Sequence, residues 1–549
     1  MDVITLNQAL AEAARNQPEH GIAIYDRRGR NAERRTYAEL AELARQRGAR
    51  LAAAGVARGD RVLLAMPTSW ELLETFFGAL ELGALPVMVA PPGALGSAAT
   101  YCAKIDRLIQ LLEPTKIVCD AGMREYLHDP QQRSTALQLT VTPTELGALA
   151  PSHYTPAPPE GGLAFIQLTS GSTGNQRGVE ITHAAALHNT RAIADMVHCQ
   201  SSDVVVSWLP LNHDMGLVGC VLFSVVNALD LWLLRPETFL ARPAIWLNTI
   251  AARRATFSPA PNFAYQLCVD RIDAADLAGA DLSTWRGALS GAEMIRPETC
   301  SAFEKKFAAF GFKREHWMAC YGMAECTLAA TADRKQTGLR ETPIQTRGEE
   351  LAHDVVCTGE PVMETAVRIS STAKPGEFVD DGVIGEVYIK GPGLFGGYYR
   401  DKEATAAATH DGWLRTGDLG FLMDGELYVT GRLKDVLIIN GHNWMPHELE
   451  WEAEFATGTG GADRSGAFSV LDGPDGERPV VVVELTSAEN VVLGDIEHAI
   501  RSRIGRVLGL PLKDVVLVKR GQIPKTTSGK VQRSELRRRY IAGELQRLV

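Results

Sequence analysis

The sequence lacks the cysteine and histidine patterns that hold zinc ions or build a disulfide framework. It contains nine cysteines in 549 residues, but it has no Cys-x-x-Cys pair and no His/Cys cluster at zinc spacing. We interpret these cysteines as reduced and mostly buried thiols. The N-terminus also lacks a basic stretch followed by an apolar one, so we predict no secretory signal and a cytoplasmic protein.

Long hydrophobic runs and an excess of positive charge are absent as well. The most apolar stretch, residues 216–234, is interrupted by Asn227 and Asp230, which favours a buried helix and strand over a membrane span. The formal net charge of -10 argues against nucleic acid as the main partner. One basic run near the C-terminus consists of Arg533, Arg537, Arg538 and Arg539. We interpret this run as a solvated helix face.

The pattern of apolar residues predicts an α/β protein with more than one domain. No repeat with a period of roughly 20 to 50 residues is present, which argues against repeat architectures. The chain is too long for one ordinary core, so two or more domains are expected. A strand at residues 62–66, a helix at 70–82 and a strand at 86–89 follow one another. This order predicts a parallel sheet.

The pattern of predicted strands and helices changes around residues 431–434. Before this point, alternating strands are predicted at residues 385–390 and 426–430. After it, two strands and a helix are predicted at residues 467–471, 480–485 and 494–508. We therefore predict an N-terminal domain over residues 1–432 and a small C-terminal domain over residues 433–549.

A loop rich in glycine and hydroxyl groups follows a strand predicted at residues 163–168, and a helix is expected from Thr182. The loop reads Thr169-Ser170-Gly171-Ser172-Thr173-Gly174-Asn175-Gln176-Arg177-Gly178. Glycines let the backbone approach a polyanion closely, while hydroxyls, N–H groups and a basic side chain supply donors and charge. The loop therefore predicts a phosphate site. It is not a Walker A loop, because no Gly-Lys-Ser/Thr occurs at the required spacing.

Two later segments carry side chains suited to nucleotide chemistry. Asp418 lies between glycines and can accept hydrogen bonds from both hydroxyls of a ribose, and Arg432 follows it. Lys530 lies in a loop rich in glycine and hydroxyl residues, from which a lysine can reach a site in another domain and stabilise phosphoryl transfer as a point charge. Taken singly, Gly-Asp is a common turn and a loop lysine is usually a surface residue.

The order of these motifs resembles the superfamily of acyl- and aryl-CoA synthetases, adenylation domains and luciferases, from the region of Thr36 to Arg533. Five segments resemble its fatty acyl-AMP ligase branch: residues 208–217, 258–265, 290–293, 321–327 and 441–446. The resemblance implies a large N-terminal adenylate-forming domain with stacked α/β sheets and a small β-barrel-like part. It also implies a small mobile C-terminal α+β domain.

The resemblance further implies ATP and Mg²⁺ as cofactors and assigns roles at the matching positions. The phosphates would lie against Thr169, Ser170, Gly171, Ser172, Thr173 and Gly174. The adenosine would lie against Gly291, Ala292, Glu293, Tyr321, Gly322, Met323, Ala324, Asp418 and Arg432. Glu325 would bind magnesium. Lys530 would be the catalytic lysine, with His213 beside the reacting carboxylate, Met215 and Gly216 along the acyl channel, and Lys434 as the hinge.

The chain departs from the usual patterns of this superfamily at four places. Gln176 and Arg177 stand where Pro and Lys are usual, so the charge is kept while its geometry differs. Asn212 stands where an aromatic residue is frequent. Residues 328–356 form a shorter insertion than the fatty acyl-AMP ligase branch carries, but a longer one than a plain CoA ligase needs. Because that insertion is associated with withholding activity toward CoA, the thiol acceptor stays open at this point.

The expected reaction has two steps. A fatty or related carboxylate attacks the α-phosphorus of ATP in line and pyrophosphate leaves. The C-terminal domain then rotates about Lys434, and a thiol attacks the acyl-AMP. The leading acceptor is the phosphopantetheine arm of an acyl carrier protein, and free CoA is the close alternative.

Two other functions compete with this interpretation. An inactive nucleotide- or acyl-binding protein is disfavoured because Lys530, Glu325 and Asp418 are all present. Amino-acid activation is disfavoured because no Asp after Ala255 is placed to hold an α-amino group. No local motif encodes the acyl chain length or the oligomeric state. Four residues can line the acyl channel or belong to the core: Trp208, Met215, Phe223 and Phe263.

Overall fold

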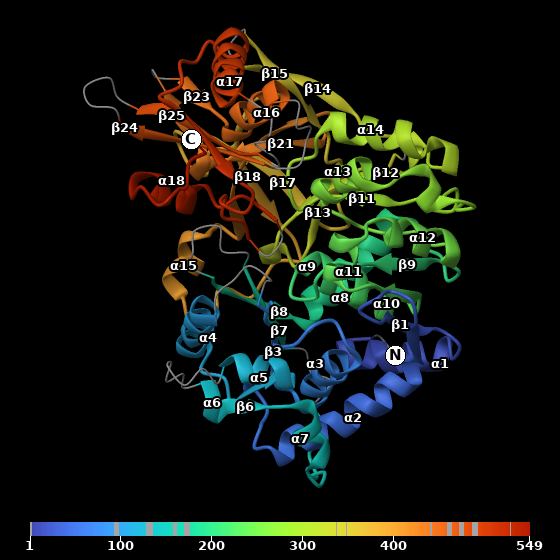
Figure 1. Cartoon of the computed structure of the whole chain (residues 1–549). Coiled ribbons are helices and arrows are strands. Elements are labelled where there is room, and N and C mark those ends of the chain that lie inside the picture. Colours follow the sequence, from blue (N-terminus) through green and yellow to red (C-terminus); the bar gives the residue numbers. More distant parts are fainter. Residues whose placement is uncertain are drawn as a thin grey trace.

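The computed structural model describes residues 3–92, 98–127, 136–156, 162–169, 176–335, 337–346, 349–439, 442–457, 464–471, 477–485, 492–526 and 529–548. The first helices and strands lie at one end of the molecule and the last ones at the other end (Figure 1). No helix within these ranges combines the length and the hydropathy needed to cross a lipid bilayer.

The N-terminal part contains the parallel sheet that the sequence predicted. Its strands lie in the order β4 (Leu85–Met88), β3 (Arg61–Ala65), β5 (Lys116–Cys119) and β6 (Thr140–Val141). After their first residues, Arg61 and Lys116, strands β3 and β5 are apolar and buried, because helices such as α3 (Trp70–Leu82) and α4 (Ala98–Leu112) cover both faces of the sheet. Helix α3 has the predicted bounds, and the Ser69 hydroxyl caps it by accepting from the Leu72 N–H.

A second, mixed sheet runs through the middle of the molecule. One half has the order β2 (Ala32–Thr36), β1 (Gly21–Tyr25), β10 (Asp230–Leu233) and β9 (Val204–Ser207). The other half has the order β11 (Ala288–Ser290), β12 (Trp317–Gly322), β13 (Ala329–Ala332) and β16 (Glu360–Pro361). Phe257 joins the halves, because it forms parallel bridges to Val205 on one side and to Gly287 on the other.

The glycine-rich loop leaves one strand and returns into another. The predicted strand is β7 (Leu163–Leu168), and helix α8 (His183–Met196) begins as expected, with Thr182 as its N-cap. Strand β8 (Gly178–Thr182), which pairs antiparallel with β7, is not predicted from the sequence. Its short alternating pattern gave too little periodicity for a strand. Residues 170–175, including Ser170, Gly171, Ser172, Thr173 and Gly174, lie outside the described residues.

An antiparallel sheet follows, and it corresponds to the expected barrel-like part. It contains β17 (Ala366–Ser370), β18 (Gly385–Lys390), β20 (Trp413–Met423), β19 (Thr409–His410) and β21 (Glu426–Arg432). The predicted strand at residues 385–390 is confirmed, and the one at 426–430 continues for two further residues. Beside this sheet, β14 (Glu341–Thr346) and β15 (Glu349–Val356) form a separate two-stranded hairpin.

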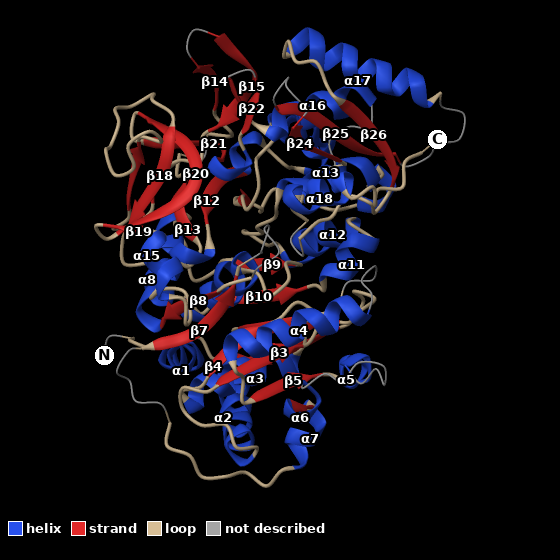
Figure 2. Cartoon of the chain, turned by 90° about the vertical axis from the view of Figure 1, so that its left-hand side faces the viewer, coloured by secondary structure: helices blue, strands red, loops and turns tan. Residues whose placement is uncertain are grey.

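The last part of the chain has its own core, built from Leu449, Val481, Ile500 and Leu517 among others. Its sheet contains β24 (Ser465–Leu471) and β25 (Glu477–Leu485), which agree with the two predicted strands, and β26 (Asp514–Lys519), which was not predicted. Helices α16 (Pro446–Thr457), α17 (Leu493–Val507) and α18 (Arg533–Ile541) pack around it (Figure 2). A small strand pair, β22 (Leu437–Ile439) and β23 (His442–Trp444), precedes it. We refer to residues 437–548 as the C-terminal unit.

The interpretation of the basic run as a solvated helix face is wrong for its first residue. Arg533 donates two hydrogen bonds, of 2.7 and 2.6 Å, to the carboxylate of Glu450, which is 4% exposed. Arg538 and Arg539 do lie toward solvent and pair with Glu535 on their own helix. The charge pattern alone could not separate these cases, since Glu450 is distant in sequence.

The other α-helices of the described residues include α1 (Leu6–Asn16), α2 (Tyr37–Ala53), α5 (Ala121–Leu127), α6 (Ala136–Leu139), α7 (Pro143–Ala148), α9 (Asp214–Gly216), α10 (Phe223–Val226), α11 (Pro236–Ala241), α12 (Ala244–Arg253), α13 (Asn262–Arg271), α14 (Pro297–Phe307) and α15 (Lys402–Ala407). A π-helix at Leu217–Leu222 lies between α9 and α10. The apolar stretch at 216–234 therefore forms a buried helix and then a strand, as predicted.

Candidate active site

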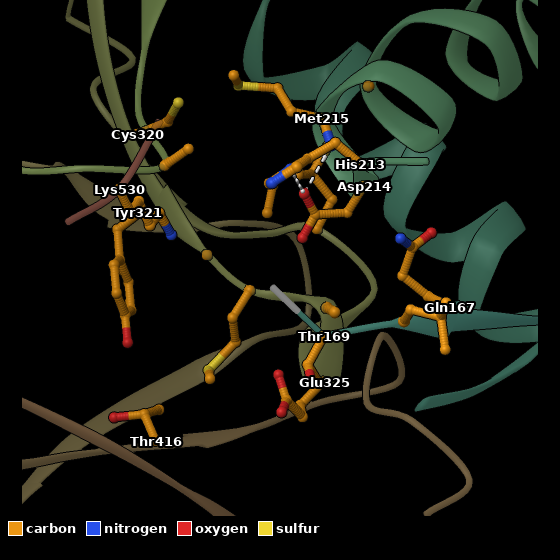
Figure 3. Close-up of a pocket in the computed structure, with 18 of the residues that line it drawn as sticks. Gln167, Thr169, His213, Asp214, Met215, Cys320, Tyr321, Glu325, Thr416 and Lys530 are labelled. Carbon is orange, nitrogen blue, oxygen red and sulfur yellow. Dashed lines mark hydrogen bonds and ion pairs between the residues drawn. The ribbon is translucent and has the colours of Figure 1, made fainter. Parts of the chain in front are cut away.

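One cavity of about 880 Å³ is lined by residues of the N-terminal sheets, of the antiparallel sheet and of the C-terminal unit. Its polar lining includes Thr169, Arg177, His213, Glu325, Tyr321, Arg432, Lys434 and Lys530. Its apolar lining includes Ile193, Met196, Val197, Val205, Phe223 and Phe257. The close-up shows Lys530 and Tyr321 on one side, His213 and Met215 on another, and Glu325 beside Thr169 (Figure 3). A single space thus joins polar groups to an apolar recess.

Lys530 reaches this cavity from a tight turn of the C-terminal unit. The Thr526 N–H donates to the Lys530 carbonyl at 2.8 Å, and the Lys530 N–H donates to Thr526 Oγ1 at 3.1 Å. Gly529 has a φ of +89°, and a Cβ there would lie 3.3 Å from the Phe263 ring, so the turn packs closely on α13. Burial and the charge of Arg432 hold the pKa of Lys530 below its ordinary value.

The acids around Lys530 counter this effect only in part. Asp214, Asp418 and Glu293 each act to raise the pKa of the lysine. Three carboxylates and two cations therefore lie close enough to influence one another's charge. Such clusters of opposed charge are typical of sites where charge changes during a reaction.

His213 lines the cavity and is held through one of its ring nitrogens. Its Nδ1 lies 3.0 Å from Asp214 Oδ1, which also accepts from the Met215 N–H at 2.8 Å. Burial acts to raise the pKa of Asp214, but the hydrogen bond from His213 and the charges of His213 and Lys530 lower it overall. His213 Nε2 is buried and has no hydrogen-bond partner among the described residues. A polar ligand atom could satisfy it.

Asp418 and Arg432 lie opposite each other on β20 and β21, where their Cα atoms are in register. Arg432 Nε lies 2.9 Å from Asp418 Oδ1, and the Tyr321 hydroxyl donates to Asp418 Oδ2 at 2.8 Å. A carboxylate offers about four acceptor positions. The buried Asp418 therefore retains capacity for two more donors, as the hydroxyls of a ribose would supply.

The expected adenine-binding segments meet at the edge of β11 and β12, but not all of their residues face the cavity. Ala292, Tyr321, Gly322, Met323 and Ala324 line it, whereas Gly291 and Glu293 do not.

Gly291 and Gly322 are required for close packing instead. A Cβ on Gly291 would lie 2.8 Å from the Cys320 carbonyl oxygen, and one on Gly322 would lie 1.7 Å from that of Leu328. Glu293 accepts from the Phe263 N–H at 2.6 Å and so fixes the start of α13.

Glu325 is the only carboxylate of the Tyr-Gly-x-Ala-Glu segment, and it is 7% exposed at the cavity wall. The Tyr398 hydroxyl donates to its Oε1 at 2.8 Å, and burial raises the pKa of this carboxyl. No group of three or more His, Cys, Asp or Glu side chains suited to a metal occurs in the described ranges. A single carboxylate fits Mg²⁺, which typically binds one or two carboxylates together with substrate phosphates.

The base of the phosphate loop is closed by hydrogen bonds. Thr169 Oγ1 accepts from the Arg177 N–H at 3.0 Å, and Gln176 Nε2 donates to the Thr169 carbonyl at 3.1 Å. The Arg177 guanidinium lies over the Tyr398 ring, 5.0 Å from its centroid. Arg177 thus lies near the partner of Glu325, at the position where lysine is usual.

Some of the residues expected along the acyl channel line the cavity, and others do not. Met215 and Phe223 line the cavity, but Gly216 does not, because it packs under the Pro210 carbonyl, where a Cβ would lie 2.3 Å away. Trp208 stacks on Phe239 in the core, with ring centroids 4.0 Å apart. The recess is formed instead by residues that no motif indicated: Ile193, Met196, Val197, Val205, Phe257 and Leu289.

Lys434 lies in a short 3₁₀ turn, Leu433–Asp435, that leads from β21 into the C-terminal unit. Its side chain lines the cavity, and burial and Arg432 lower its pKa. The adjacent Asp435 lies 3.4 Å from Arg533, which follows Lys530 by three residues. The proposed pivot and the base of the Lys530 turn are therefore joined by one arginine.

Comparison with known proteins gives consistent matches along the whole chain. A family described as AMP-binding enzyme matches residues 10–399. A putative acyl-CoA synthetase of Caulobacter vibrioides is 34% identical, over 99% of this chain and 96% of that protein. JamA of Moorena producens, a medium-chain-fatty-acid–[acyl-carrier-protein] ligase, is 32% identical over 93% of this chain and 90% of its own length. The long-chain-fatty-acid–AMP ligase FadD26 of Mycobacterium tuberculosis is 32% identical over 89% and 88%.

Solved structures of adenylate-forming enzymes also match this chain. A structure from a study of fatty acyl-adenylate ligases of E. coli and L. pneumophila superposes with a TM-score of 0.90 at 32% identity, covering 99% of both chains. McyG A-PCP, complexed with phenylalanyl-adenylate, gives a TM-score of 0.85 at 25% identity, over 98% of this chain and 83% of that one.

Proposed function

We propose, since this chain belongs to the AMP-binding enzyme family, that it activates a fatty acid and transfers the acyl group to the phosphopantetheine thiol of an acyl carrier protein. The chain is an acyl-adenylate-forming ligase of mixed α/β fold. The observation that carries the proposal is the cavity in which Lys530, Glu325 and Arg432, the ion-pair partner of Asp418, share a space with apolar side chains.

In the first step the substrate carboxylate lies beside His213 Nε2 and attacks the α-phosphorus of ATP in line. A new C–O–P linkage forms, and the bond to pyrophosphate breaks. Catalysis then depends on positioning and on charge stabilisation. Lys530 donates to the oxygens that gain charge, and Asp418 with Arg432 fixes the ribose. Glu325 would hold Mg²⁺, which neutralises phosphate charge when it is bound.

In the second step a thiol attacks the carbonyl carbon of the acyl-AMP, and AMP leaves. The C-terminal unit rotates about Lys434, which withdraws Lys530 and presents the segment around His442 to the cavity. Rotation about a few residues at the end of an element is an ordinary hinge motion.

A carrier protein is favoured as acceptor by the hairpin β14–β15 and by the name of the relative JamA. The segment that leads into the hairpin is tied to β21, because Lys335 Nζ lies 2.9 Å from Glu426 and Arg340 forms two contacts with the same carboxylate. Arg340 also donates to Asp333 at 3.2 Å. A fixed insertion at this position would obstruct a free CoA more than a carrier-bound arm.

The acceptor is tested by supplying ATP, a fatty acid and either CoA or a holo carrier protein, and by mass spectrometry of the products. Formation of acylated carrier protein without acyl-CoA supports the proposal. Acyl-CoA as the main product identifies an acyl-CoA synthetase. Arg340→Gln should raise the acyl-CoA yield, because it loosens the hairpin. The matched control is Arg334→Gln, whose partner Asp195 lies on α8. A chain that releases no pyrophosphate with any acid would instead be an inactive binding protein.

A further inference from the structure

The apolar recess of the cavity has one wall that is a single residue thick. Val197, at the end of α8, and Phe257 both line the recess, and they are 1% and 2% exposed. Arg286 contacts both residues from the opposite side. Its guanidinium lies 4.3 Å from the centroid of the Phe257 ring, and its Nη1 donates to the Val197 carbonyl at 2.7 Å.

The outer face of this arginine meets solvent, since 30% of its side chain is exposed. Val197 and Phe257 therefore line the recess and also contact Arg286, which in turn reaches solvent. The arginine is also rigidly held. It lies 2.7 Å from Asp203, which is 4% exposed, and it donates to the His198 carbonyl at 3.2 Å.

The Phe257 ring has no room to move away from Arg286. It lies between β9 and the segment leading into β11, and a Cβ added to Gly287 would be 2.4 Å from its Cδ1. The ring therefore sits between the neighbouring backbone and the guanidinium plane. Cation–π stacking on a partly desolvated face adds to this restraint.

We infer that Arg286 closes the recess and thereby sets the longest acyl chain that the site accepts. The inference rests on the proposed function, because it takes the recess as the acyl site. Arg286 contacts no substrate. It acts by holding Phe257 and the Val197 carbonyl in place, so that the terminal methyl of a longer acid has no space.

The test compares acids of increasing chain length. Arg286→Ala alone would leave Asp203 buried and unpaired, so the variant to use is the double substitution Asp203→Asn/Arg286→Ala. For the wild type, kcat/KM of pyrophosphate release should fall on the order of 10-fold or more at the first methylene beyond the limit, as for an overfilled closed pocket. In the double variant we expect most of this loss to disappear and the limit to move to longer acids.

Two single substitutions give further readouts. Arg286→Lys keeps the charge beside Asp203 but loses the planar stacking on Phe257, and it should move the limit in the same direction by a smaller amount. Gly287→Ala would place a Cβ 2.4 Å from Phe257 Cδ1, so the ring must shift and the length limit should change. The matched control is Arg253→Ala. Arg253 stacks on Trp232 at 3.7 Å and donates to Tyr25 at 3.2 Å, and neither aromatic residue lines the cavity.

An unchanged length profile in the folded double variant and in Gly287→Ala would overturn the inference. So would an equal shift in Arg253→Ala. Thermal stabilisation by the same acids gives a readout that does not depend on turnover. If the wild type binds acids with a length limit but releases no pyrophosphate, the proposed function fails while the role of Arg286 is still tested.

Discussion

Arg296 and Glu454 form a buried ion pair across the boundary between the two parts of the chain. The Arg296 guanidinium is 2.5 Å from the Glu454 carboxylate, and their side chains are 9% and 3% exposed. Arg296 precedes α14, whereas Glu454 lies on α16 of the C-terminal unit, beside Trp451, over which the guanidinium also stacks at 5.2 Å. Because Lys530 belongs to the same unit, this pair helps to hold the lysine in the cavity.

Arg296→Gln should therefore slow adenylate formation more than thiol transfer. Removing one partner of a buried pair typically costs about 3–5 kcal/mol of stability. Here this loss destabilises the contact between the two parts of the chain that holds Lys530 in the cavity. Pyrophosphate exchange and transfer from supplied acyl-AMP would be measured separately. The control is Arg503→Gln, which breaks the equally short pair of Arg503 on α17 with Glu452 on α16. This pair lies entirely within the C-terminal unit. Equal losses in both steps for both variants would contradict the prediction.

Lys530→Met should abolish exchange and yet stabilise the fold at neutral pH. Loss of one charge-stabilising donor costs on the order of 10²–10³ in rate. The folded pKa of Lys530 lies below its ordinary 10.5, so the unfolded chain binds this proton more tightly. The charged lysine is thus unfavourable below the folded pKa, and this cost disappears as the pH rises toward 10.5. The gain in Tm should shrink over the same range, and a gain that grows with pH would refute the assignment.

Lys434→Pro should leave adenylate formation intact and slow the transfer step. Proline fixes φ and removes the N–H, which restricts rotation of the backbone at this turn. Lys434→Ala serves as the control, since it removes the side chain but keeps the backbone free. If alanine slows transfer as much as proline does, the side chain and not the backbone is important.

Arg533→Gln should lower kcat for adenylate formation with little change in the KM for ATP. Arg533 fixes the base of the Lys530 turn to Glu450 and to Asp435, so its loss disorders the lysine, while the nucleotide contacts remain. We expect a decrease of about 10-fold or more, the scale seen when a supporting contact of a site is lost. Arg537→Gln is the control, because Arg537 lies on the same helix and donates to the Ser469 carbonyl. A similar decrease there would indicate a general effect on α18.

Glu325→Gln should raise the Mg²⁺ concentration needed for half-maximal activity by about 10-fold or more, as expected when a metal site loses a supporting group. Titration of pyrophosphate release against Mg²⁺ at saturating ATP would measure this. The control is Glu386→Gln. Glu386 is a buried carboxylate that also lines the cavity but pairs with Arg415 at 3.1 Å. The metal role would be rejected if both variants responded alike.

From the sequence alone one could predict the α/β class, several of the strands and the polar groups of the candidate site. Strand and helix bounds such as 70–82 followed from local periodicity, and Lys530, Asp418 and Glu325 stood in motifs that resemble a known superfamily. The sequence could not place β8, whose pairing with β7 closes the loop after Thr169. It also could not distinguish Gly216 or Trp208, which belong to the core, from Met215, which faces the cavity.

The apolar residues that form the recess, and the group that closes it, become visible only in the three-dimensional structure. Val197, Phe257 and Arg286 come from separate segments, and each looks locally like an ordinary core or surface residue. The same holds for Arg296 and Glu454, and for Arg533 with Glu450. Periodicity and motifs report interactions between neighbours in the chain, whereas burial and ion pairing depend on distances in space that no local pattern encodes.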